Sequence, residues 1–186
     1  MGLKEDVQNT LGELALDFLE CQGDLSVTVP KDKIVDALTK LRDDLGFDFL
    51  SDVFGVDNSA FYEKLAKAKA KKKKGEEDKK EEEPQGPPPP RFEVIYLLLS
   101  LETNRRLAVK VKVPEDDLVV DSVTSLWRAA DWPEREVFDM FGIKFKGHHN
   151  LKRLLMWDEF PAHPLRKDYP LEGQGEERIM EYNDND

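Results

Sequence analysis

The chain has 186 residues, 39% of them apolar, and a formal net charge of −11 at pH 7. This length and apolar content suit one ordinary domain with its own hydrophobic core. The negative charge argues against a nucleic-acid binder, because affinity for phosphate requires clustered lysines and arginines. The apolar runs are far shorter than the roughly 20 residues that cross a bilayer, so we expect no membrane span.

The cysteine content limits the redox and metal chemistry that this chain can support. The single cysteine, Cys21, has no partner for a disulfide, and one thiol cannot hold an iron–sulfur cluster or a structural zinc. The first residues lack a basic stretch followed by an apolar one, so we expect no secretory signal and a cytoplasmic chain. Any role in electron transfer then depends on clusters that other chains hold.

The first 56 residues predict two helices and two strands. Apolar residues recur at helical spacing over residues 7–18, and Gly23 follows as a stop. Residues 25–29 alternate between apolar and polar types, as in a half-buried strand. A second helix is predicted from Pro30 to Leu45, because a proline favours the first helical turn and an apolar stripe follows. A strand over residues 47–56 comes next.

The composition changes after residue 65. Residues 66–90 are rich in lysine, glutamate and proline, with Lys71–Lys74 in the first half and Pro87–Pro90 at the end. Such sequence buries too little apolar surface to offset the entropy of ordering, so we expect a solvated insertion with extended polyproline character. A nucleic-acid or anionic-membrane contact through Lys71–Lys74 is the weaker alternative, because acidic residues begin two positions later.

Regular structure resumes at Arg91. Residues 92–98 and 107–113 both alternate in apolar character, and the turn formers at 102–105 separate them. This pattern predicts an antiparallel hairpin. Together with the earlier elements it predicts an α+β fold, in which helices pack on one mixed β-sheet in two layers.

Residues 131–142 predict a short helix with both ends marked. Asp131 is a candidate N-cap, with Glu134 three residues further on as in a capping box. Gly142 can end the helix in a left-handed conformation. Arg135 and Asp139 lie one turn apart, so they could form an ion pair.

Three carboxylates lie on this helix, at Glu134, Glu136 and Asp139. We interpret them as a charged helix face rather than as a catalytic pair. A metal site of helical spacing is not supported, because the nearest histidine, His148, lies nine residues beyond Asp139 and follows a glycine.

From residue 131 onward the chain carries a long motif of five stretches: Glu134–Glu136, Asp139–Ile143, Gly147–His148, Leu151–Met156 and His163–Pro170. This motif covers nearly 40 contiguous residues and resembles the signature of the C-type subunit family of NADH:quinone oxidoreductase, also called the 30 kDa subunit family. One departure is His149, where the family usually has proline. The Lys/Glu-rich insertion does not resemble the family either.

The resemblance implies a non-catalytic subunit of the hydrophilic arm of complex I, with an extended C-terminal tail that wraps over the D-type subunit. The B-type subunit is the second implied partner, and the ferredoxin-like I-type subunit is a further candidate. NADH, FMN, iron–sulfur clusters and quinone belong to the complex as a whole, and none is expected on this chain. The implied location is peripheral, on the cytoplasmic side of the membrane.

The tail supports this interpretation independently. Residues 143–170 contain three prolines and no clear period, yet many aromatic residues, which a partner surface would bury. Trp157, Tyr169, Arg153 and Arg166 are the expected anchors, because these residue types dominate interfaces. The residues expected at the interface or in the signature are Glu134, Arg135, Glu136, Asp139, Phe141, Gly142, His148, Leu151, Arg153, Trp157, His163, Pro164, Arg166, Lys167, Asp168 and Tyr169.

We therefore expect a core domain from residues 1–65 and 91–130, the insertion 66–90, a signature helix and tail over 131–170, and an acidic end over 171–186. No catalytic, metal-ligating or cofactor-binding residue is assigned.

The three histidines receive structural roles. A metal site from His148, His149 and His163 is disfavoured, because neighbouring residues of an extended chain point in opposite directions. Proton delivery to quinone by one of them is equally disfavoured, and hydrogen bonding in turns or at an interface is preferred.

Two other hypotheses stay open. One is the equivalent subunit of a related membrane-bound hydrogenase, or of a complex that takes electrons from ferredoxin or a reduced deazaflavin, since no residue here identifies the electron donor. The other is a stand-alone metal-dependent hydrolase, which stoichiometric bound zinc or iron would favour.

Overall fold

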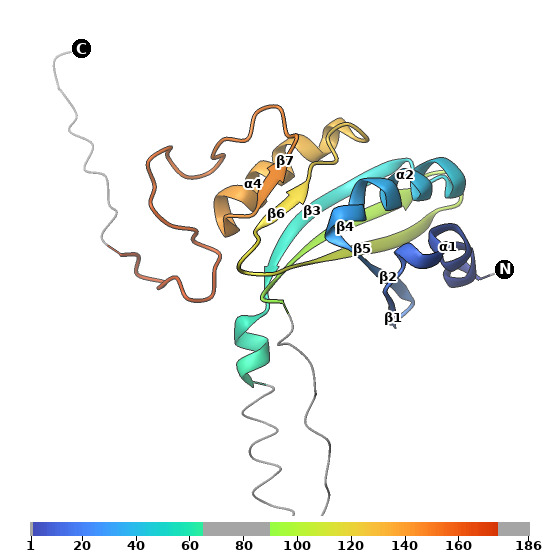
Figure 1. Cartoon of the computed structure of the whole chain (residues 1–186), viewed down its shortest axis with the longest axis horizontal. Coiled ribbons are helices and arrows are strands. Elements are labelled where there is room, and N and C mark those ends of the chain that lie inside the picture. Colours follow the sequence, from blue (N-terminus) through green and yellow to red (C-terminus); the bar gives the residue numbers. More distant parts are fainter. Residues whose placement is uncertain (1, 65–89, 175–186) are drawn as a thin grey trace, which may run out of the picture.

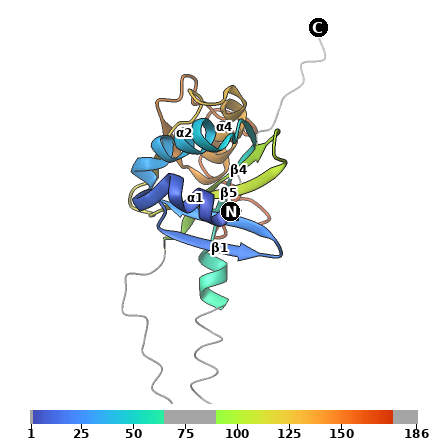
Figure 2. The same ribbon diagram turned by 90° about the vertical axis from the view of Figure 1, so that its right-hand side faces the viewer.

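The computed structural model describes residues 2–64 and 90–174. Within these residues a five-stranded mixed sheet has the order β1-β2-β5-β4-β3, and β6 pairs with β7 in a second, two-stranded sheet. Helices α1, α2 and α4 lie on one side of the larger sheet (Figures 1 and 2). The α+β fold with helices on one mixed sheet is thus confirmed.

The centre of the sheet is the predicted hairpin. Strands β4 (Phe92–Ser100) and β5 (Arg105–Val113) pair antiparallel, with Tyr96 opposite Val109. Alternate side chains of both strands are buried under the helices, as the period of two predicts. Strand β5 pairs in parallel with β2 (Asp24–Val29), which makes the sheet mixed.

The first helix is shorter than predicted. Helix α1 (Leu3–Leu11) ends at Gly12, where φ is +54°, and residues 17–21 form strand β1 (Asp17–Cys21) instead of helix. Gly23, with φ of +92°, lies in the tight turn that joins β1 antiparallel to β2. The apolar spacing over residues 7–18 was misleading because it spans a helix, a 3₁₀ turn and a strand that face the same core.

The elements before the insertion otherwise follow the prediction. Helix α2 (Ile34–Leu45) comes after a 3₁₀ turn and ends at Gly46 in the left-handed conformation. Strand β3 (Phe49–Asp57) then pairs antiparallel with β4 at the edge of the sheet. Residues 66–89 of the expected insertion 66–90 lie outside the described residues, as do residues 175–186 of the acidic end.

Helix α4 (Asp131–Phe141) packs against β3 and ends at Gly142 in the left-handed conformation, as predicted. Asp131 is not the N-cap. A 3₁₀ turn over residues 128–130 runs directly into the helix, so Ala130 takes that position and Asp131 is already helical. The close approach of α4 to β3 depends on Gly55, where a Cβ would lie 2.6 Å from the ring of Phe141.

Strands β6 (Val119–Asp121) and β7 (Lys144–Lys146) bracket α4 and pair in parallel. Val120 and Phe145 bury their side chains in the same core as the larger sheet. After β7 the chain runs through turns and bends to residue 174. None of the described helices is long and apolar enough to span a bilayer.

Candidate functional site

The C-terminal turn of α4 is covered by the tail. The last carbonyl groups of a helix lack partners within the helix. Here the ring Nδ1 of His163 lies 2.8 Å from the Asp139 carbonyl oxygen, and Nε of Arg166 donates to the Phe141 carbonyl at 2.8 Å. The backbone N–H of Leu165 donates to Met140. The tail therefore completes the hydrogen bonding of this helix end.

Asp139 receives the strongest set of donors in this region. One carboxylate oxygen accepts backbone N–H groups from Leu154, Leu155 and Met156 at 2.8–2.9 Å, and the other accepts Nη1 of Arg153 at 2.6 Å. Burial by itself raises the pKa of Asp139, but these donors outweigh it and hold the pKa below its ordinary value. A buried, ionised aspartate thus orders the first part of the tail.

Arg153 links this carboxylate to a later part of the tail. Its Nη2 donates to the carbonyl oxygens of Phe160 and Ala162, while its Nη1 holds Asp139. We call Asp139, Arg153, His163 and Arg166 the tail clamp. All four side chains come from the signature, and the structure brings them together at the end of α4.

The ion pair that helical spacing allows between Arg135 and Asp139 is not formed. Arg135 donates instead to the backbone carbonyls of Lys152 and Arg153, at 3.1 and 3.0 Å. Asp139 points toward the tail, where it receives Arg153 and three N–H groups. Helical spacing predicted neighbours on one helix, but both side chains found partners in the irregular chain that packs beside it.

A second attachment of the tail lies where β3 ends and β4 begins. Asp57, at the end of β3, is fully buried and receives Arg91 at 2.8 Å and the backbone N–H of Lys167 at 2.9 Å. Burial raises the pKa of Asp57, but Arg91 and the N–H donors outweigh it, so its pKa is well below the ordinary range. Arg91 also contacts Glu115 and Asp168. The tail is therefore tied to both sides of the insertion.

Sequence reasoning missed Asp57, Arg91 and Glu115. Arg91 directly follows the low-complexity stretch, where a charged side chain is expected to be solvated, and Asp57 and Glu115 belong to no motif. No local pattern in the sequence therefore marks these three residues. Lys167 and Asp168 were nominated, but the structure uses the backbone of Lys167 and the exposed carboxylate of Asp168.

The first turn of α4 holds a different carboxylate. Glu134 is fully buried and accepts the Ser122 hydroxyl at 2.6 Å and the Val123 N–H at 2.7 Å. Burial, the largest influence, raises its pKa to about 7, although both hydrogen bonds act in the opposite direction. Burial and the nearby Glu134 also raise the pKa of Tyr96. Glu134 therefore fastens α4 to the segment after β6 instead of forming a capping box.

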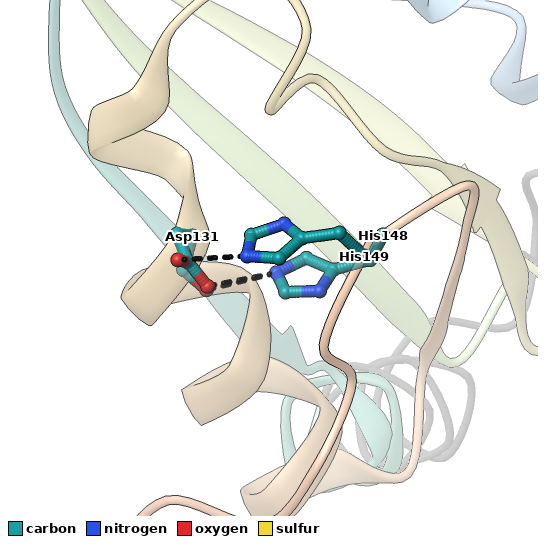
Figure 3. A group of neighbouring side chains, drawn as sticks. All are labelled: Asp131, His148 and His149. Carbon is teal, nitrogen blue, oxygen red and sulfur yellow. Dashed lines mark hydrogen bonds and ion pairs between the residues drawn. The ribbon is translucent and has the colours of Figure 1, made fainter.

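The same turn faces two adjacent histidines (Figure 3). Nε2 of His148 lies 3.2 Å from Oδ1 of Asp131, and Nε2 of His149 lies 3.4 Å from Oδ2. The two rings stack with 8° between their planes. The expectation that neighbouring histidines point apart is therefore wrong here, because they lie in a turn after β7 and not in an extended strand.

The aromatic residues of the tail form one cluster. Trp157 meets Phe160 edge to face at a centroid distance of 4.8 Å, and Tyr169 lies 6.3 Å from the same Phe160 ring. Phe160 is buried, while Trp157 and Tyr169 are half-buried. Leu151 packs on the core, and Pro164 is half-buried, whereas Glu136 is exposed.

Large apolar side chains nevertheless remain exposed around α4 and along the tail. Leu155 and Leu165 are 61% and 48% exposed, although their flanking residues are held by the tail clamp. Trp132, on the first turn of α4, and Leu171 are exposed as well. Exposed apolar side chains held on an ordered frame are typical of a surface that binds another protein.

Comparison with known proteins identifies the family of the chain. Residues 27–175 match the family described as the 30 Kd subunit of respiratory-chain NADH dehydrogenase. The C subunit of the NADH-quinone oxidoreductase of Citrifermentans bemidjiense is 43% identical, over 94% of this chain and 89% of that protein. The corresponding C subunit of Hydrogenovibrio crunogenus is 44% identical, over 96% of this chain and 83% of that protein.

Solved structures show the same fold. A trypsin-resistant fragment of Nqo5 matches with a TM-score of 0.60 and 29% identity, over 81% of this chain and all of that fragment. A chain of the archaeal membrane-bound sulfane sulfur reductase matches with a TM-score of 0.64, over 90% of this chain and 85% of that one, at 23% identity. The chain belongs to the 30 kDa subunit family of respiratory-chain NADH dehydrogenase, the C-type subunit family of NADH-quinone oxidoreductase.

Proposed function

We propose that this chain is a non-catalytic subunit of the peripheral arm of proton-pumping NADH:quinone oxidoreductase, on the cytoplasmic side of the membrane. It docks on the D-type subunit, which helps to form the quinone site, and on the B-type subunit next to it. The ferredoxin-like I-type subunit is a third candidate neighbour. NADH, FMN, iron–sulfur clusters and quinone are bound by those and other subunits.

One observation carries the docking role. The tail is irregular, yet Asp139 and Arg153 fasten it to the end of α4, while Leu155 and Leu165 project from it into solvent. An irregular segment that exposed leucines without being fastened would lose much conformational entropy on binding. The fastened tail presents its apolar side chains in advance, which lowers that cost.

The geometry leads us to propose different side chains for the contact with the partner. Arg153 and Arg166 already donate to carbonyl groups of this chain, so we assign them to holding the tail. The anchors that reach the partner are then the exposed Trp132, Leu155, Leu165 and Leu171. Each can remove a large apolar surface from water on binding, worth about 1.5–3 kcal/mol when fully buried.

The test is coexpression of the full chain with the D-type and B-type subunits of the same organism. In the double variant Leu155→Glu/Leu165→Glu, two charges replace exposed leucines, so folding is retained but the partners are lost in copurification. The matched control is Leu16→Glu/Leu101→Glu, because both of these leucines are 62% exposed. Leu16 precedes β1, at the opposite edge of the sheet from β3 and α4, and Leu101 lies in the β4–β5 turn.

The control variant is expected to copurify as the parent does. Copurification of the Leu155→Glu/Leu165→Glu variant in undiminished yield would refute docking through the tail. Loss of the partners from both variants would refute it too, because the effect would then not depend on the tail surface.

A second candidate function rests on the fold match to the sulfane sulfur reductase complex. It is the equivalent subunit of a hydrogenase-type complex, or of one that receives electrons from ferredoxin or a reduced deazaflavin. The subunits that copurify with the chain distinguish the two candidate functions. Copurified NADH-oxidising, FMN-containing subunits support the first function, and their replacement by nickel–iron or ferredoxin-linked subunits supports the second.

A further inference from the structure

We propose that Asp131, His148 and His149 form a binding site for one divalent transition-metal ion of the zinc type. The site would join the first turn of α4 to the turn after β7, where the tail begins (Figure 3). It lies apart from the tail clamp, and it does not depend on assembly with other subunits.

The ligand atoms already converge. One nitrogen from each ring and one carboxylate oxygen all lie within 4.8 Å of one another. Zinc–ligand bonds of about 2.0–2.2 Å place the ligand atoms of a tetrahedral site roughly 3.3 Å apart. Nε2 of His148 already lies at that spacing from Oδ1 of Asp131, at 3.2 Å, and Nε2 of His149 lies 3.4 Å from Oδ2, the other oxygen of the same carboxylate. The two rings are stacked, so binding of one ion requires the exposed His149 ring to turn toward it.

A second observation points to a cation. Oδ1 of Asp131 is buried, and no described residue gives it a hydrogen bond that meets normal geometry, although Nε2 of His148 lies 3.2 Å away. A buried carboxylate oxygen without a donor is costly. A cation between the carboxylate and the two rings would satisfy Oδ1 and neutralise the negative charge.

The ligand chemistry selects the metal class. Two imidazoles and one carboxylate suit Zn²⁺ and its neighbours Cu²⁺ and Ni²⁺, whereas Ca²⁺ and Mg²⁺ prefer sites made only of oxygen ligands. With three protein ligands, the fourth position of a tetrahedral ion is left to water. Such a site differs from the closed four-ligand zinc sites that proteins need for folding.

Metal binding requires one proton to move. The backbone N–H of Asn150 donates to Nδ1 of His148, so without metal the neutral ring carries its proton on Nε2, 3.1 Å from the Asp131 carbonyl oxygen. Coordination through Nε2 moves that proton to Nδ1 and releases the Asn150 N–H. This N–H lies in an exposed turn, where water can replace the lost acceptor. The ring of His149 is 64% exposed and can turn toward the ion.

The adjacent histidines decide how many ligands the site offers. Asp131 and His148 alone supply two, too few for a specific zinc site, and His149 supplies the third. His149 is also the position at which this chain departs from the signature.

The test uses the full, untagged chain titrated with Zn²⁺ by calorimetry and with Co²⁺ by visible spectroscopy. We expect one ion per chain and the intense absorption of four-coordinate Co²⁺. Asp131→Asn and His149→Ala should each weaken Zn²⁺ binding by more than roughly 100-fold, the upper end of what loss of a supporting partner costs. Asp158→Asn, which removes an exposed tail carboxylate, is the matched control and should bind as the parent does.

A second measurement distinguishes Zn²⁺ binding at this site from nonspecific binding to acidic residues elsewhere on the chain. Nitrogen NMR of the histidine rings should show the proton of His148 moving from Nε2 to Nδ1 when Zn²⁺ is added. The proposal is overturned if no ion binds stoichiometrically. It is also overturned if Asp131→Asn and His149→Ala bind Zn²⁺ as tightly as the parent, or if the His148 proton stays on Nε2.

Discussion

The two ends of α4 each bury a carboxylate, with opposite consequences. At the start, Glu134 has two neutral donors, Ser122 and the Val123 N–H, and burial raises its pKa to about 7. At the other end, Asp139 has three N–H donors and an arginine, and these hold its pKa below the ordinary value despite burial. Burial alone therefore does not decide the charge of a carboxylate; the number and charge of its donors do.

The difference also separates two kinds of attachment. The start of α4 is fastened to the domain by a buried carboxyl that keeps its proton up to about pH 7. The end is fastened to irregular chain by an ionised group whose donors come from residues 153–156. A charged anchor can order a segment that has no regular hydrogen-bond pattern of its own, and this is what the tail requires.

The largest effect is expected when the ionised carboxylate of Asp139, at the C-terminal end of α4, is removed. Asp139→Asn puts an amide NH₂ against backbone N–H donors and leaves the nearly buried Arg153 without its counter-charge. Removing one partner of a buried ion pair costs about 3–5 kcal/mol. We expect the free energy of unfolding, measured by denaturant titration of the isolated chain, to fall by that amount. Hydrogen exchange of the Leu154–Met156 amides should also become faster.

The matched control for this change is Glu136→Gln, on the exposed face of the same helix. It should alter the free energy of unfolding by no more than about 0.5 kcal/mol, as is usual for surface positions. Equal stability of the Asp139→Asn and Glu136→Gln variants would mean that the tail is not held by this carboxylate.

The role of Glu134, in the first turn of α4, is tested by the dependence of stability on pH. The folded-state pKa of Glu134, about 7, lies above the ordinary value of 4.5, so the folded chain keeps a proton that the unfolded chain releases between these pH values. The contribution of Glu134 to stability is therefore full below about pH 4.5 and is lost as pH rises through 7, a change of about 3 kcal/mol.

Glu134→Gln removes this dependence, because glutamine does not ionise. Its amide oxygen can accept the Val123 N–H, and its NH₂ group can donate to the Ser122 hydroxyl oxygen, which reverses that hydrogen bond. The variant should match the parent near pH 4.5 and exceed its stability by up to about 3 kcal/mol above pH 8. Denaturant titrations at several pH values measure the difference. A constant difference between variant and parent across this range would show that Glu134 ionises normally in the fold.

The smallest effect is expected further along the tail. Asp168 is 64% exposed and shares Arg91 with the buried Asp57. Asp168→Asn should lower the free energy of unfolding by less than about 1 kcal/mol, because exposed ion pairs contribute little and Arg91 keeps its other partners. A loss as large as that of Asp139→Asn would make Asp168 a main anchor of the tail, which would remove the distinction between buried and exposed attachments.

Much of the fold was predictable from local patterns. The hairpin over residues 92–113 alternates with a period of two, and α2 has both an apolar stripe and a glycine stop, so period and turn chemistry agree. The first helix was mispredicted past Leu11 because periodicity reports which residues face the core, not which element carries them. Glycines at 12 and 23 decided the boundary, and their positive φ angles appear only in the structure.

The sequence predicted which segment forms the site, but it did not predict which side chains of that segment contact one another. The signature located residues 131–170, but it could not show that Arg153 holds Asp139 or that Arg135 turns to the tail. Both side chains had acceptable partners on their own helix. Their actual partners lie in the irregular tail, which passes within hydrogen-bond distance of the helix. The spacing of residues along the sequence does not predict that contact.

The sequence by itself determined the family, the mixed α+β architecture, the single unpaired thiol and the irregular nature of the tail, because composition, period and motif are local properties. Tertiary structure alone decided the long-range pairings. Asp57 binds the Lys167 N–H across 110 residues, and two histidines meet Asp131 across a helix and a strand. Such partners are selected by burial and by unsatisfied donors and acceptors, which exist only once the chain has folded.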